Sequence, residues 1–264
     1  MSASHRGLSW SLLLPPLVVP TVGALFYFVI VPEGALGKSV YTATKLFTLL
    51  YPVFFLRQIG LGGIIRRRRE DSTVEWPGWR SVVVIGLATG VAIAAVGFLL
   101  MLTPLGEMVR EGAGRVAARA EGLGFKEHFL LFAIFVSVIH SGLEEYYWRW
   151  FLYGQLRHKM TRRDSEEVLK SYFSPEALNW ELGWKERPAA HLIAAVAFGG
   201  HHLIITLQFF PAALAFFLTA CVVVGGLIWS IMYERQGTVV GCWVSHLCVD
   251  VMLMIIGFEL IMGA

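Results

Sequence analysis

The chain has 264 residues, of which 56% are hydrophobic and 16% are charged, and its formal net charge is +3. Average proteins carry about 25% charged residues, so this composition and the mean hydropathy of +0.63 exclude an ordinary soluble fold. The positive charge comes largely from arginines beside apolar runs, which favours contact with membrane lipids and indicates no nucleic-acid partner.

Seven apolar runs predict membrane-spanning helices, because a bilayer core about 30 Å thick needs about 20 apolar residues per helix. The predicted spans are 10–31, 40–57, 80–103, 128–153, 188–209, 211–233 and 238–262. We therefore expect an all-α, polytopic membrane protein with seven helices, or eight if one is hidden. Residues 1–126 are expected to hold three helices and an interfacial segment, and residues 127–264 the functional core.

The first half of the chain is informative mainly through its hydropathy. Gly86 and Gly90 have the spacing that lets a second helix approach closely, and we expect them to pack within the chain. Residues 103–127 alternate charged and small residues, which is typical of an amphipathic helix at the membrane surface.

Charge asymmetry predicts the orientation of the chain in the membrane. Outside the spans, 15 lysines and arginines fall on the side of the N-terminus and five fall on the other side. The positive-inside rule then places the N-terminus in the cytoplasm and the C-terminus outside. We expect an integral protein of a prokaryotic plasma membrane, with a short surface helix or a gate in the polar connection 157–187.

Ionisable residues occur inside three of the later spans. They are Glu144, Glu145 and Arg149 in the span 128–153, His201 and His202 in the span 188–209, and His246 and Asp250 in the span 238–262. One Asp, Lys or Arg at mid-membrane costs about 2.5–3.5 kcal/mol on insertion scales. Uncompensated, several of them would outweigh ordinary helix packing, so these side chains must face one another or water.

The spacing of these residues predicts one shared cavity. Residues four apart lie on the same face of a helix, which pairs Glu145 with Arg149 and His246 with Asp250. Glu144 is turned away from Glu145 and is free to face the cavity. A carboxyl group in apolar surroundings holds a proton more readily than one paired with arginine, so Glu144 has the properties of a general base.

Other polar residues in the spans have simpler explanations. A histidine in a span usually makes a hydrogen bond to another helix, which we expect of His140, His191 and His201. Lys45 lies within two turns of the outer end of its predicted span, so we expect its ammonium group to snorkel to the surface. An interfacial aromatic belt is expected from Tyr146, Tyr147, Trp148 and Trp150.

Three motifs on successive late spans carry a family resemblance. They are EExxxR at Glu144, Glu145 and Arg149, FxxxH at Phe198 and His202, and HxxxD at His246 and Asp250. In this order they resemble the CAAX protease and bacteriocin-processing family of intramembrane peptidases, which includes the type II CAAX prenyl proteases. The resemblance covers about residues 127–264 and implies a helical peptidase core with a catalytic cavity open to the cytoplasm.

The resemblance implies an endopeptidase that acts on a membrane-associated protein or peptide. Glu144 would be the general base and His202 its assistant, with Glu145, Arg149 and Phe198 in support. His246 and Asp250 would stabilise the oxyanion. The prenyl protease branch usually has asparagine at the last position, and an ionised aspartate cannot donate a hydrogen bond. Asp250 must therefore be protonated, orient His246 or bind a metal.

The same residues leave two alternatives open. No cofactor is expected, because the HExxH signature of zinc peptidases is absent, but Glu144, His202, His246 and Asp250 are credible Zn²⁺ ligands. A transporter or proton relay uses buried glutamate, histidine and aspartate equally well. Such folds commonly show repeat symmetry, whereas this chain shows no internal repeat. The sequence names neither the substrate nor the oligomeric state.

Overall fold

The computed structural model describes residues 8–32, 34–56, 61, 64, 77–160 and 188–263, and these residues contain helices and no strand. The predicted all-α class is confirmed. The helices are α1 (Trp10–Leu25), α2 (Ala35–Phe54), α4 (Trp79–Met101), α5 (Pro104–Glu111), α6 (Ala113–Gly122), α7 (Phe129–Ile134), α8 (Ser141–Glu144), α9 (Gly154–Met160), α12 (Pro188–Phe209), α13 (Ala212–Gln236) and α14 (Val240–Met262). Wider, π-helical turns form η1 (Phe26–Ile30), η2 (Phe135–His140) and η3 (Glu145–Tyr153).

Six helical stretches in the described residues are long and apolar enough to cross a membrane. They are Trp10–Ile30, Trp79–Met101, Phe129–Arg157, Pro188–Phe209, Ala212–Gln236 and Val240–Met262. The remaining predicted span, 40–57, is found as α2, which has 20 residues but is less apolar because it carries lysines and threonines. The multi-pass membrane character is confirmed, whereas the predicted total of seven or eight spans is not.

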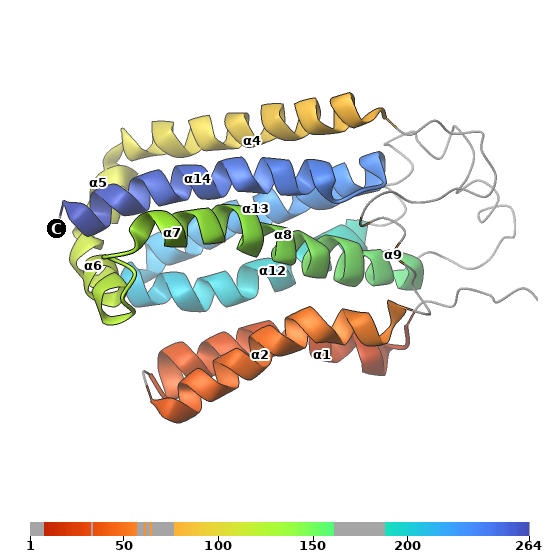
Figure 1. Cartoon of the computed structure of the whole chain (residues 1–264), viewed down its shortest axis with the longest axis horizontal. Helices are drawn as coiled ribbons and strands as arrows, with labels where there is room; N and C mark the ends of the chain where they lie inside the picture. Colours follow the sequence, from red (N-terminus) through yellow and green to blue (C-terminus); the bar gives the residue numbers. More distant parts are fainter. Residues whose placement is uncertain are drawn as a thin grey trace, which may run out of the picture.

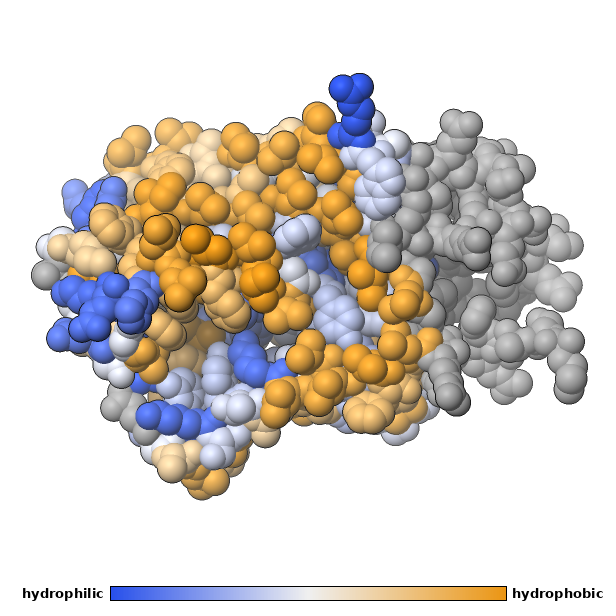
Figure 2. Space-filling view, in the orientation of Figure 1, coloured by the Kyte–Doolittle hydropathy of each residue, from blue (hydrophilic) through white to orange (hydrophobic). Residues whose placement is uncertain are grey.

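The long helices run nearly parallel to one axis of the molecule, with α1 and α2 as a hairpin on one side (Figure 1). The C-terminal end of α14 lies at the end of the bundle where α5 and α6 are found. Apolar residues cover most of the visible face between the two ends, and hydrophilic residues gather beside α5 and α6 (Figure 2). This surface fits helices surrounded by lipid.

Close packing of α4 on α14 holds the last helix in place. A Cβ atom on Gly86 would lie 2.6 Å from the Gly241 carbonyl oxygen, and one on Gly90 would lie 2.6 Å from that of Ser245. The small-residue face of α4 is therefore used within the chain, as predicted, and it supports the helix that carries His246.

A tight turn joins α13 to α14. Gly237 has a φ of 64°, in the left-handed region that glycine adopts at little cost, and its amide donates to the Tyr233 carbonyl oxygen at 3.0 Å. Thr238 then accepts a hydrogen bond from the amide of Val240 at 3.3 Å. The turn sends α14 back along the bundle and fixes where its polar residues fall.

Hydrogen bonds to free carbonyl groups of α1 join the two helices of the α1–α2 hairpin to each other and join the hairpin to η3. Proline has no N–H group, so Pro16 and Pro20 leave the carbonyl oxygens of Leu12 and Pro16, four residues earlier, without a helical donor. The Tyr51 hydroxyl donates to Leu12 at 2.9 Å, and the Tyr147 hydroxyl donates to Pro16 at 2.8 Å. These bonds satisfy backbone groups that lipid could not.

The predicted aromatic belt is wrong for most of its members. Tyr147, Trp148 and Trp150 are each at most 3% exposed, and they pack in the core rather than at a lipid interface. The sequence did not reveal this because α1 and α2 lie over η3, which is a long-range contact.

Most of the segment 103–127 is helical, as predicted, but it forms two helices, α5 and α6, that meet at Gly112, and turns follow from Leu123 onwards. The Thr103 side chain caps α5 by accepting from the amide of Leu105. The predicted gate in 157–187 lies outside the described residues from 161 onwards. Several arginines used for the orientation, including Arg66–Arg69, also lie outside them.

Candidate active site

Glu144 sits where two helical geometries meet. It is the last residue of α8, and η3 begins at the next residue, with η2 ending shortly before it. Wide π-helical turns are frequent at functional sites because they turn side chains out of regular register. Here they place Glu144 and Glu145 at the centre of the bundle, where both side chains are buried.

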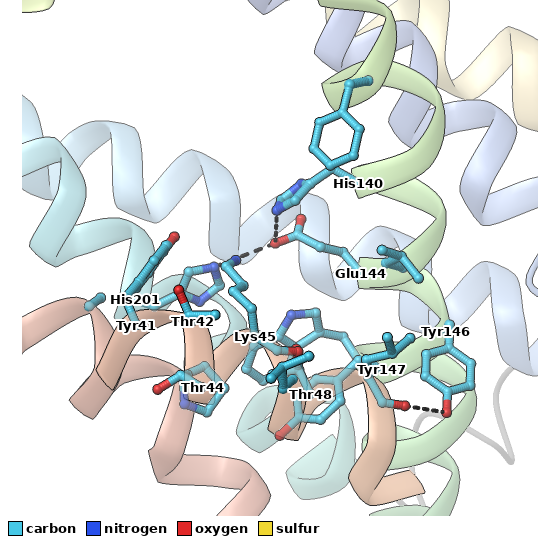
Figure 3. A pocket seen from close by; sticks show the side chains of 17 residues that line it. Tyr41, Thr42, Thr44, Lys45, Thr48, His140, Glu144, Tyr146, Tyr147 and His201 are labelled. Carbon is cyan, nitrogen blue, oxygen red and sulfur yellow. Dashed lines mark hydrogen bonds and ion pairs between the residues drawn. The ribbon is translucent and has the colours of Figure 1, made fainter. Parts of the chain in front are cut away.

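Three histidines from three parts of the chain face the Glu144 carboxylate. His140 Nε2 lies 3.8 Å and His201 Nε2 lies 3.5 Å from Oε1, and His246 Nε2 lies 3.7 Å from Oε2. Figure 3 shows His140 and His201 reaching this carboxylate from different sides. A carboxylate next to imidazoles is suited to exchange protons with a water molecule held between them.

The predicted ion pair between Glu145 and Arg149 is present. Glu145 Oε1 lies 3.0 Å from Arg149 Nη1 and 2.8 Å from His246 Nδ1. The Arg149 guanidinium lies over the rings of Phe198 and Trp229, with 4.4 Å and 4.9 Å to the ring centroids. Phe198 therefore supports the site by packing against the arginine, as a cation–π contact.

His246 is held by a hydrogen bond and a stacked ring. Its Nδ1 is bonded to Glu145, and its ring stacks on Trp229 with 4.1 Å between the centroids. Its Nε2 lies 3.7 Å from Asp250 Oδ1, which is too long for a hydrogen bond. Glu145, rather than Asp250, is thus the residue that orients His246. Asp250 Oδ2 is buried and has no hydrogen-bond partner among the described residues.

His202 is oriented by its own helix. Its Nδ1 lies 2.8 Å from the Phe198 carbonyl oxygen, which is a hydrogen bond only if Nδ1 carries the proton, so Nε2 keeps a free lone pair in the neutral ring. One donor atom from each of Glu144, His201 and His202 lies within 4.8 Å of the other two. His202 therefore faces Glu144, as the catalytic interpretation requires.

The donor set formed by Glu144, His201 and His202 fits a zinc ion in its chemistry. Two imidazoles and a carboxylate plus water make a common catalytic zinc site, and the bond from His202 to the Phe198 carbonyl is the usual second-layer support. This set includes His201, whereas the set expected from the sequence had His246 and Asp250 in its place. The Nδ1 atom of His246 is already taken by Glu145.

Sequence reasoning missed two histidines and two tryptophans. We expected His140 and His201 to make hydrogen bonds between helices, and both face Glu144 instead. The spacing of four between His140 and Glu144 was a usable signal, but nothing in the sequence distinguished His201. Trp148 stacks on His201 with an interplanar angle of 2°, and Trp229 stacks on His246.

His191 behaves as predicted. Its Nε2 lies 3.0 Å from the Tyr153 hydroxyl, and its Nδ1 lies 2.7 Å from the Ser230 hydroxyl. These partners belong to η3 and α13, so this histidine links helices and lies apart from the site.

A cavity of about 350 Å³ opens in front of Glu144. Its walls come from α1, α2, α12 and the helix that carries Glu144, and they are mainly apolar. The polar lining residues are Tyr41, Thr42, Thr44, Lys45, Thr48, His140, Glu144, Tyr146, Tyr147, Trp148 and His201. Figure 2 shows hydrophilic residues recessed between apolar ones on this face, so a polar group could reach the carboxylate from inside the apolar region.

A family model described as type II CAAX prenyl endopeptidase Rce1-like matches residues 126–252. This segment, just under half of the chain, is similar to that family. The matched segment contains all of the buried ionisable residues discussed above, and it confirms the relationship to type II CAAX prenyl proteases. The match supports, in general terms, an intramembrane endopeptidase of the CAAX type. No curated protein and no solved structure matches the chain.

Proposed function

We propose that this Rce1-like chain hydrolyses peptide bonds of a membrane-associated protein or peptide, with Glu144 as the general base. The observation that carries the proposal is the carboxylate of Glu144 at a cavity inside the bundle, within 3.5–3.8 Å of three imidazole nitrogens. A water molecule bound there would lose a proton to Glu144 as its oxygen attacks the peptide carbonyl. Glu144 would then return the proton to the departing amine.

His202 and His201 assist the water in this mechanism. The free Nε2 of His202 accepts a hydrogen bond from the water. This bond orients the water so that a lone pair of its oxygen points towards the substrate. His201 Nε2 lies against Glu144 Oε1 and restricts the rotation of the carboxylate. General acid–base assistance of this kind contributes about 10²–10⁴-fold to a rate.

His246 stabilises the oxyanion of the tetrahedral intermediate. Its Nδ1–H donates a hydrogen bond to Glu145. Nε2 can therefore donate to the oxyanion only when the ring is a doubly protonated imidazolium. The carboxylates of Glu144, Glu145 and Asp250 surround this ring and stabilise such a cation. Asp250 acts through His246 in this scheme, so an ionised Asp250 need not donate to the oxyanion.

The proposed mechanism requires no resident metal. If zinc is bound, Glu144, His201 and His202 would hold it, and it would supply a Lewis acid that polarises the water. The roles of Glu145, Arg149 and His246 do not depend on that ion.

The direct test uses the nearly isosteric substitution Glu144→Gln. Membranes from cells that carry the wild type or the variant are compared by mass spectrometry of protein termini, and the affected peptides are then offered to the purified enzyme. We expect the new termini to disappear and the purified variant to lose about 10²–10⁴-fold in cleavage rate. Glu107→Gln, an exposed glutamate in α5, is the matched control.

Two outcomes would count against the proposal. Identical protein termini and full cleavage by the Glu144→Gln variant would show that Glu144 is not the general base. The other outcome is that a zinc chelator abolishes activity, that added zinc restores it, and that one zinc is bound per chain. That result would contradict the metal-free mechanism. Retained activity in chelator is the result that we expect.

A further inference from the structure

Lys45 is exposed and lies further from the nearest end of its helix than the predicted span suggested. The predicted span began at residue 40, but α2 begins at Ala35. Lys45 is therefore ten residues into the helix, about 15 Å along its axis, and nine residues before its end at Phe54. The snorkelling explanation depended on a nearby helix end, and the observed boundaries remove that support. Although α2 is less apolar than the six spanning stretches, it packs against α1 and η3, so a lysine halfway along it is a candidate functional residue.

The Lys45 side chain lines the cavity in front of Glu144. Among the described residues that line this cavity, Lys45 is the lysine and there is no arginine. Figure 3 shows Lys45 and its α2 neighbours on the side of the cavity opposite the Glu144 helix. Its ammonium nitrogen lies 5.3 Å from the centroid of the Tyr41 ring, a contact that stabilises a cation without neutralising it. Within the described ranges, no carboxylate lies within ion-pair distance of it.

Hydroxyl residues of α2 line the same cavity as Lys45. Tyr41, Lys45 and Thr48 are spaced four and three residues apart and share one face of α2, and Thr42 also lines the cavity. The Thr48 hydroxyl donates to the Lys45 carbonyl oxygen at 2.8 Å, which leaves its lone pairs available. The wall therefore offers one full positive charge and several groups able to bind a polar ligand.

We propose that Lys45 binds a carboxylate of the peptide substrate while Glu144 directs the attack on a nearby peptide bond. The inference rests on the proposed function and specifies the substrate class, which is peptides with a carboxylate near the cleaved bond. Of the carboxylates in the site, Glu144 lines the cavity and repels an anionic substrate, and Lys45 on the opposite wall offers the positive charge that attracts one. A cavity of about 350 Å³ is at the small end for ligand sites, so the anchored carboxylate must lie close to the bond that is cut.

A carboxylate can come from the free C-terminus of the substrate or from an aspartate or glutamate side chain. The test offers the purified enzyme matched peptides that end in a free acid or an amide, each with aspartate and glutamate or with asparagine and glutamine. The wild type is compared with Lys45→Met, with Lys45→Arg and with Lys38→Met, a control on α2 outside the cavity lining. Glu144→Gln defines the background rate.

We expect Lys45→Met to slow carboxylate peptides at least tenfold more than their neutral counterparts, through KM rather than kcat. Lys45→Arg should restore most of the preference, and Lys38→Met should match the wild type. If the effect of Lys45→Met disappears when the free C-terminal acid is replaced by an amide, Lys45 binds the terminal carboxylate. If it disappears when aspartate and glutamate are replaced by asparagine and glutamine, Lys45 binds an acidic side chain.

Equal slowing of charged and neutral peptides, or none, would overturn the inference while leaving the proposed function intact. The same holds if the effect of Lys45→Met appears only in vesicles with anionic lipid, because Lys45 would then bind a headgroup. If no peptide is cut in a Glu144-dependent way, the proposed function fails, and the role of Lys45 fails with it.

Discussion

Arg149 and Glu145 are among the most buried charged side chains in the molecule, at 2% and 0% exposure. Each depends on the other, because a charge left alone inside a bundle loses its hydration and gains nothing in return. Glu145 has a second partner in His246, whereas the described partners of Arg149 are Glu145 and two aromatic rings. Loss of Arg149 would leave Glu145 with His246 alone, and loss of Glu145 would leave the buried Arg149 without an anion among its described partners, which is the more damaging change.

At this position we expect Arg149→Met to lower the free energy of unfolding by about 3–5 kcal/mol, the usual cost of breaking a buried ion pair. The double variant Glu145→Gln/Arg149→Met should recover part of the loss, because no charge remains unpaired. The measurement is the unfolding midpoint in detergent, with the exposed Arg80→Met as control. A double variant less stable than Arg149→Met alone would contradict this account.

Sequence reasoning found the residues of the site whose cost in a membrane is high. Charged residues such as Glu144, Arg149 and Asp250 could be identified from the sequence, because inserting them into a membrane costs free energy whichever way they face. Histidines and tryptophans carry a smaller penalty, so the part played by His201 or Trp229 depends on which face of which helix meets the next one. That information is not contained in one helix's sequence, and His201 was accordingly assigned a structural role.

At the scale of helices, the small residues of α4 decide where α14 lies. A side chain at Gly90 would collide with the backbone of Ser245, the residue before His246. A shift of α14 by a few tenths of an ångström moves His246 relative to Glu144 and Glu145. Packing outside the matched family segment thus controls geometry within it.

We expect Gly90→Ala to destabilise the protein by about 1–3 kcal/mol, as overpacking does, and to reduce cleavage more than Gly257→Ala. A Cβ atom on Gly257, in α14, meets no atom within 4 Å, so the control changes helix propensity without changing packing. Unfolding and cleavage rates of both variants check this. Equal behaviour of the two variants would show that the contact between α4 and α14 does not set the site.

Helix positions were largely predictable, and their internal shape was not. The spans 188–209 and 80–103 agree with α12 and α4 to within two residues, because long apolar runs mark them clearly. The π-helical turns η2 and η3 left no mark in the hydropathy pattern. The same is true of the hairpin contacts, which depend on two proline-freed carbonyl groups meeting Tyr51 and Tyr147.

For the whole molecule, the positions of the loops predict an experiment on orientation. In a background without the native cysteines, we introduce Ser9→Cys, Gly34→Cys, Gly114→Cys and Gly263→Cys, all near helix ends or on α6. A membrane-impermeant maleimide should label the last three in intact cells and the first only after lysis, because the positive-inside rule puts Ser9 in the cytoplasm. Labelling in the opposite sense would reverse the orientation, and with it the side from which substrates arrive.

The ion pair within the Glu144 helix has a consequence for how the protein is made. The stretch Phe129–Arg157 leaves the ribosome before α12 and α14 exist, yet it carries two glutamates and Arg149 within it, besides Arg157 at its end. Glu145 and Arg149 neutralise each other as soon as that helix forms, whereas Glu144 has His140 beside it in the helix and gains His201 and His246 only later. We expect this helix to linger at the translocon until the last helix is synthesised, so that insertion of the active site is completed only at the end of translation.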